Sequence, residues 1–193
     1  MAGFTIKRLN HLVLWVRDAQ RSLAFYRDVL GFSIVEMPSP QAVFLRASGS
    51  DNHHDLGLFG IGADAPPPSD GRQVGMYHAA WEVNTIQDLA NARQALLQSG
   101  HLVGESDHGN SLSLYAKDPD GNELEVFWML PREEWQARGF GTRRLDLAKE
   151  LVARTSYSDQ RGGDQPRRDP PATRRQHRPA RMLARCSFQE SGN

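Results

Sequence analysis

The chain has 193 residues, with 23 lysines and arginines against 23 aspartates and glutamates, and one cysteine. A single cysteine excludes a disulfide framework and a cysteine-based zinc site. No run approaches the ~18 apolar residues that a membrane helix needs, and the first ten residues lack a secretory apolar stretch. We therefore expect a soluble, cytoplasmic protein with no membrane partner.

The balanced charge hides an asymmetry along the chain. Residues 155–193 hold eight arginines and four acidic residues, whereas residues 1–154 hold 15 basic and 19 acidic side chains. A mildly acidic body gives no reason to expect nucleic-acid binding. Prolines, paired glycines and a lack of apolar periodicity predict a disordered, solvated tail over residues 155–193. The alternative for this tail is an arginine-rich arm for an anionic partner.

The body contains a weak internal repeat with an offset of 67 residues. Each copy begins with a strand-like run and continues into a helix, with Asp18 as the N-cap of the first helix and Thr85 as the N-cap of the second. A glycine ends each helix, and three strand-like runs follow it. The predicted strands after the helices are residues 33–37, 42–47 and 55–61 in the first copy, and residues 101–105, 111–116 and 123–129 in the second.

This pattern predicts an α+β fold made of two βαβββ modules. Such a module exposes one face of its sheet, so two modules are expected to pack together and bury it. We place the modules at residues 1–61 and 76–130, joined by a proline-rich linker at residues 62–75. Residues 131–154 are predicted to form a helical extension.

Histidines at equivalent positions of the repeat indicate a shared metal site. His11 and His78 each lie seven residues before a helix cap, and a pseudo-twofold arrangement of the modules would bring them to one point. Glu125, between apolar neighbours on the last strand, could complete the set. Two imidazoles and one carboxylate are typical of non-haem Fe(II) oxygen chemistry. The alternative is that the histidines are hydrogen-bonded structural residues and the glutamate is a solvated side chain.

Further polar residues lie where they could serve the same site. His54, in the segment His53-His54-Asp55, could move a proton, because an unperturbed imidazole has a pKa of ~6.5; the alternative is a polar loop. Tyr115 lies ten residues before Glu125 across a predicted hairpin, so both side chains could face one cavity. The alternative for Tyr115 is a core aromatic residue with a satisfied hydroxyl.

The repeated strand–helix–three-strand plan with this triad resembles the vicinal oxygen chelate superfamily. The fold hosts many activities, so the plan alone is unspecific. The His-His-Asp-Leu segment at residues 53–56 and the segment from Asp107-His108-Gly109 through Asp118-Pro119-Asp120-Gly121 to Glu125 are similar to type I extradiol catechol dioxygenases. At this length, the chain resembles the one-domain members of that group.

The resemblance implies a ring-opening dioxygenase that acts on catechol-type diols with dioxygen. It implies that His11, His78 and Glu125 bind Fe(II), with Mn(II) as the alternative metal. It also implies a role in the breakdown of aromatic compounds and assembly of the subunits, often as homodimers.

The same resemblance implies roles for three residues around the metal. His54 would serve as the acid–base residue, with His53 as the weaker candidate of the pair. Tyr115 would hydrogen-bond an oxygen of the substrate, and His108 would assist at the substrate hydroxyl.

Three other functions of this fold are alternatives. A glyoxalase-like lyase usually takes a further carboxylate from the last strand of the first half, where residues 56–59 read Leu-Gly-Leu-Phe. A fosfomycin-resistance-type transferase shares the triad but leaves the combination of His54 and Tyr115 unexplained. A metal-free small-molecule binding protein, of the bleomycin-sequestering type, usually lacks the triad.

Overall fold

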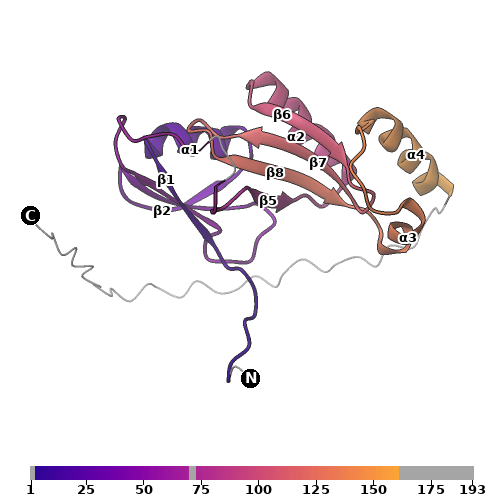
Figure 1. Ribbon diagram of the computed structural model, residues 1–193, viewed down its shortest axis with the longest axis horizontal. Helices are drawn as coiled ribbons and strands as arrows, with labels where there is room; N and C mark the ends of the chain where they lie inside the picture. The colour runs from indigo at the N-terminus through magenta and orange to yellow at the C-terminus, as the bar shows by residue number, and fades with distance from the viewer. Residues whose placement is uncertain (1–2, 70–72, 161–193) are drawn as a thin grey trace, which may run out of the picture.

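The computed structural model describes residues 3–69 and 73–160. Two modules of equal topology lie side by side, and a helical extension follows them at the far end of the second module (Figure 1). The α+β fold of two βαβββ modules is therefore confirmed. Most of the predicted tail, residues 161–193, lies outside the described residues.

The first module forms a four-stranded sheet in the order β1-β4-β3-β2. β1 and β4 are parallel, while β4, β3 and β2 pair antiparallel. The predicted cap of the helix is confirmed, because the Asp18 carboxylate accepts hydrogen bonds from two backbone N–H groups of the first turn. The elements are β1 (Leu12–Val16), α1 (Ala19–Asp28), β2 (Ser33–Ser39), β3 (Ala42–Arg46) and β4 (Leu56–Gly60).

The second module repeats this plan with the sheet order β5-β8-β7-β6 and a parallel β5–β8 pair. Thr85 and Asp88 form a complete capping box at the start of the helix. His11 and His78 each lie directly before the first strand of their module, one position outside its regular pairing. The elements are β5 (Ala79–Glu82), α2 (Ile86–Gln98), β6 (Leu102–Asp107), β7 (Ser111–Lys117) and β8 (Glu123–Met129).

Each sheet buries one face against its helix, and the opposite face is partly exposed. Side chains alternate between the two faces of a strand, so every second residue enters the core. In β7 and β8 the core face carries only apolar residues, which leaves the polar residues of these strands on the opposite face. The fully or nearly fully buried core of this sheet comprises Leu89, Leu96, Leu112, Leu114, Ala116, Leu124 and Val126.

The turn between β7 and β8 is held by its own side chains. The Asp118 carboxylate accepts hydrogen bonds from the backbone N–H groups of Asp120 and Asn122, both at 2.9 Å. Gly121 has a φ of +92°, which favours glycine, and its N–H donates to the Asp118 carbonyl at 3.0 Å. The predicted Asp-Pro-Asp-Gly turn is thus present, and it sets the register of the β7–β8 hairpin.

The same turn joins the two modules through α1. The Asp120 side chain is only 4% exposed and pairs with the guanidinium groups of Arg17 and Arg21. The backbone N–H of Arg17 also donates to Asp120 at 2.9 Å. Beside this pair, the Tyr26 hydroxyl donates to Asp118 at 3.3 Å. Burial raises the pKa of Asp118, and burial together with the neighbouring Asp118 carboxylate raises the pKa of Tyr26.

The helical extension contains η1 (Arg132–Glu134), α3 (Trp135–Arg138) and α4 (Leu147–Gln160). It lies at the end of the second sheet that is remote from the first module (Figure 1). The helix α4 continues past residue 154, where the predicted extension ends. Within residues 3–69 and 73–160, no helix combines the length and apolar character needed to cross a membrane.

We predict that Asp120→Ala lowers the free energy of unfolding by about 2 kcal/mol, because it removes a buried carboxylate that accepts from the Arg17 N–H and from two guanidinium groups. Urea unfolding measures the difference. The matched control is Asp51→Ala, whose partner Arg8 and own side chain are exposed, so little change is expected. Equal stabilities of the two variants would contradict a stabilising role for the Asp120 contact.

Candidate active site

The register of the second sheet places the predicted site residues on one face. Glu125 pairs with Ala80 of β5 on one side and with Tyr115 of β7 on the other. His78 lies two residues before Ala80, which in an extended chain returns its side chain to the same face. Residues from three strands therefore meet at the open face of this sheet.

His78 and Glu125 are in direct contact. The His78 Nε2 atom lies 3.2 Å from a Glu125 carboxylate oxygen, and the two side chains are 24% and 13% exposed. The other ring nitrogen, Nδ1, is buried and has no hydrogen-bond partner within the described part of the chain. The His78 Nε2 atom and the Glu125 carboxylate therefore face each other. An imidazole nitrogen and a carboxylate oxygen are both common metal ligands.

Tyr115 connects this pair to His108. The His108 Nε2 atom lies 2.8 Å from the Tyr115 hydroxyl. Burial, followed by the charge of Glu125 and a hydrogen bond to it, raises the pKa of Tyr115 to about 12. The nearby charge of Glu125 favours a Tyr115 O–H that points toward that carboxylate, which leaves His108 as the donor of the 2.8 Å contact, so we assign the proton of His108 to Nε2. The resulting chain runs from His108 through Tyr115 to Glu125.

A second cluster of histidines lies at the first module. The rings of His11 and His54 have centroids 4.6 Å apart, and the His53 and His54 Nδ1 atoms are 3.0 Å apart. Burial, with further contributions from His11 and His53, lowers the pKa of His54. The third residue of this segment, Asp55, is buried and accepts from the Ala47 backbone N–H at 2.9 Å, which is a structural role.

The two modules differ at equivalent positions of the site. Gly57 of the first module occupies the position that Glu125 has in the second. It pairs with Val13 and Phe44, at the positions where Glu125 pairs with Ala80 and Tyr115. A Cβ atom on Gly57 would come within 3.3 Å of a Val13 methyl group and 3.5 Å of the Phe44 ring. The first module therefore has no carboxylate where the second has Glu125.

An aromatic surface occupies this open face of the first sheet instead. Trp15, which is 66% exposed, contacts Phe59 with ring centroids 5.9 Å apart, and Phe59 contacts Phe44 at 5.7 Å. His54 packs its ring against Phe44 at 5.0 Å. A planar apolar ring is well suited to such a surface.

The structure brings the predicted residues into two groups: His78, Glu125, Tyr115 and His108 in one, and His11 with His54 in the other. In the part of the chain that is described, no three His, Cys, Asp or Glu side chains lie close enough together to hold a metal ion. The triad of His11, His78 and Glu125 stays a prediction. Its chemistry fits a divalent metal, because an imidazole and a carboxylate already converge on one point.

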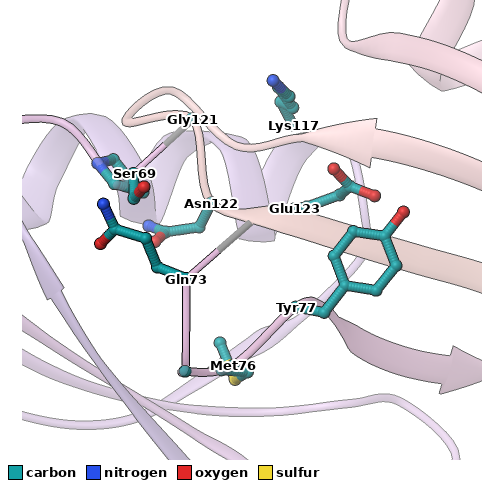
Figure 2. Close-up of a pocket in the computed structure, with 10 residues that line it drawn as sticks. Ser69, Gln73, Met76, Tyr77, Lys117, Gly121, Asn122 and Glu123 are labelled. Carbon is teal, nitrogen blue, oxygen red and sulfur yellow. The ribbon is translucent and has the colours of Figure 1, made fainter. Parts of the chain in front are cut away.

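A polar cavity of about 560 Å³ lies beside the His78–Glu125 pair and was not predicted. Figure 2 shows Tyr77 and Glu123 next to each other at one side of it, with the amides of Gln73 and Asn122 at the other. The Tyr77 ring lies 4.9 Å from the His78 ring. The period of two along β8 indicates that Glu123 shares a face with Glu125, but no sequence signal marks Tyr77 or Gln73.

With this geometry established, comparison with known proteins identifies the family. The family described as the Glyoxalase/Bleomycin resistance protein/Dioxygenase superfamily matches residues 8–126. The chain belongs to this superfamily. A glyoxalase/dioxygenase of the superfamily from Nostoc punctiforme has the same fold, with a TM-score of 0.58 and 20% identity over 68% of this chain and 97% of that chain.

Two curated relatives carry dioxygenase names. Catechol-2,3-dioxygenase of Bacillus subtilis (strain 168) is 30% identical over 128 residues, which are 66% of this chain and 44% of that protein. Biphenyl-2,3-diol 1,2-dioxygenase 3 of Rhodococcus globerulus is 33% identical over 120 residues, 62% of either chain. The chain thus spans about half the length of the curated relatives it matches.

We predict that Tyr115 titrates far above the ordinary phenol pKa of 10.0 in the metal-free protein, with a midpoint of about 12. The folded protein favours the neutral phenol, so Tyr115 keeps its proton as the pH rises past 10 and loses it only near 12. The ¹³C resonance of the labelled ring, assigned by its loss in Tyr115→Phe, measures this midpoint.

Glu125→Gln provides the control for that titration. It removes the negative charge but keeps the burial, so the midpoint should fall while staying above 10.0. A midpoint that is the same with and without the Glu125 charge would show that the two side chains are not coupled.

Proposed function

We propose that this protein is an extradiol dioxygenase that opens the ring of catechol-type diols beside the two hydroxyl groups. The observation that carries the proposal is the face of the second sheet, where the His78–Glu125 pair lies next to the Tyr115–His108 hydrogen bond. The names of the relatives, which act on catechol and biphenyl-2,3-diol, support the same substrate class.

The proposed metal ligands are His11, His78 and Glu125, which would hold Fe(II), with Mn(II) as the alternative. When bound, such an ion would supply positive charge that favours the deprotonated diol and open positions for oxygen ligands. The pair at 3.2 Å supports two of these ligands directly. His11 would have to turn away from Asn10, whose side-chain oxygen lies 3.0 Å from the His11 Nδ1 atom.

The remaining residues would handle the protons of the substrate. The lowered pKa of His54 favours a neutral imidazole, which can accept a proton from a substrate hydroxyl and later return it. Tyr115, with its raised pKa, stays protonated, and its O–H would turn from Glu125 to a substrate oxygen once Glu125 holds the metal. The open aromatic face of Trp15, Phe44 and Phe59 would hold the ring of the diol.

The alternatives from the same superfamily receive less support. A lyase with a fourth, carboxylate ligand would need that group at the position where this chain has Gly57. A metal-free binding protein would have no use for an imidazole and a carboxylate that converge on one spot. Homodimer assembly, a cytoplasmic location and a role in the breakdown of aromatic compounds stay predictions.

The first test is activity on a panel of diols. Protein loaded with Fe(II) under anaerobic conditions should form a yellow ring-fission product from catechol or 2,3-dihydroxybiphenyl on exposure to air. His78→Ala should lose both bound metal and product, because a ligand is gone. His101→Ala is the matched control, since its ring contacts Phe25 and the Lys117 carbonyl away from the site. Metal-loaded protein that yields no chromophore from any diol would overturn the proposal.

The second test concerns His54. His54→Phe should retain metal and lower kcat about 100-fold, because a phenyl ring keeps the contact with Phe44 but cannot move a proton. His53→Phe, at the neighbouring position of the pair, should have a smaller effect. An unchanged kcat in His54→Phe, measured with the same metal content, would remove His54 from the mechanism.

A further inference from the structure

We propose that the helical extension is a positioning element of the active site, and that Arg138 is its central residue. The extension holds the loop that carries His108, so that the His108 Nε2–H faces the Tyr115 hydroxyl. The catalytic consequence rests on the proposed function, whereas the orientation of His108 does not. Residues 131–160 lie beyond residues 8–126, where the superfamily matches the chain.

The first contact is a backbone pairing of the extension with the residue before His108. The Asp107 N–H donates to the Arg143 carbonyl, and the Arg143 N–H donates to the Asp107 carbonyl, both at 2.9 Å. This antiparallel bridge adds a short piece of chain to the end of β6. It fixes the backbone at the point where the His108 loop begins.

The second contact is ionic and links the loop to α4. One Arg138 nitrogen donates to the Asp107 carboxylate at 2.9 Å, and the guanidinium also forms a two-point pair with Glu150 at 2.8 and 3.0 Å. The other Asp107 oxygen accepts from the Gly109 N–H at 2.7 Å. Because Asp107 is mostly buried, these bonds are shielded from water and hold the loop from both sides.

The third contact is a close crossing of the two segments. A Cβ atom on Gly109 would lie 1.7 Å from the Gly139 carbonyl oxygen, so only glycine fits there. The φ of Gly109 is +85°, which also favours glycine. The Arg143 guanidinium caps the crossing by donating to the carbonyls of Arg138 and Gly139 at 2.9 and 3.0 Å. The extension therefore passes directly over the residue that follows His108.

These contacts leave His108 with little freedom. Its own N–H donates to the Ser111 carbonyl at 2.9 Å, so the backbone is bonded at 107, 108 and 109 in turn. The Thr142 hydroxyl lies 3.5 Å from the His108 Nδ1 atom, which is long for a hydrogen bond. The position of the ring thus depends on the clamped backbone, and its tautomer on the 2.8 Å contact with Tyr115.

The test measures the His108 tautomer in the metal-free protein and does not need activity. Long-range ¹H–¹⁵N NMR of labelled histidine distinguishes a proton on Nε2 from one on Nδ1, and His108→Gln assigns the signal. The wild type should show the Nε2–H form. In Arg138→Ala the signal should shift toward an average of both forms, because the Asp107 side chain loses its ionic contact with the extension. The same variant should lower kcat on catechol about tenfold with little change in KM.

Arg93→Ala is the matched control, because Arg93 forms a comparable two-point pair with Glu105 on the same strand but does not contact the His108 loop. It should leave both the tautomer and kcat unchanged. If Arg138→Ala does not fold, Asp107→Asn replaces it in the same NMR test, and the same shift of the His108 signal is expected. Its amide oxygen can still accept from the Gly109 N–H, while the ion pair with Arg138 is lost.

A wild-type His108 signal in the folded variant would overturn the inference. Inactive wild-type protein would instead refute the proposed function, and the tautomer would still decide whether the extension positions His108.

Discussion

The buried Asp120 carboxylate, at the turn between β7 and β8, is the constraint on which the arrangement of the molecule depends. Its turn is closed by hydrogen bonds to Asp118, which set the pairing of Tyr115 with Glu125 further along the hairpin. Its carboxylate binds Arg17 and Arg21, which flank the start of α1 in the other module. One short segment therefore contributes both to the register within a sheet and to the contact between modules.

The two modules share a topology but not a chemistry. Equivalent register positions carry Gly57 and Phe44 in the first module, and Glu125 and Tyr115 in the second. A carboxylate and a hydroxyl suit a charged centre, while a glycine beside phenylalanines leaves a flat apolar surface. Such a division suits the proposed substrate, a diol with a polar edge and an apolar ring.

Local sequence signals predicted the fold because they repeat. Strand alternation, the caps at Asp18 and Thr85, and the glycine after each helix recur in both halves, and each predicts an element without knowledge of its partners. The meeting of His78 with Glu125 followed from the repeat and the period of two. The His11 position was equally regular, yet its ring lies against His54, and sequence spacing does not determine which side chains meet across the two modules.

Contacts between side chains that are far apart in the sequence left no such signal in it, although these contacts form the surroundings of the site. Arg138 and Asp107 are 31 residues apart, and neither belongs to a periodic pattern. The consequence reaches beyond this pair. A superfamily that hosts many activities on one fold obtains them from the residues placed on that fold. Here, the loop of His108 is held by residues 138–150, which lie beyond the range that the superfamily matches. The extension is therefore the part of this molecule in which its individual chemistry is to be sought.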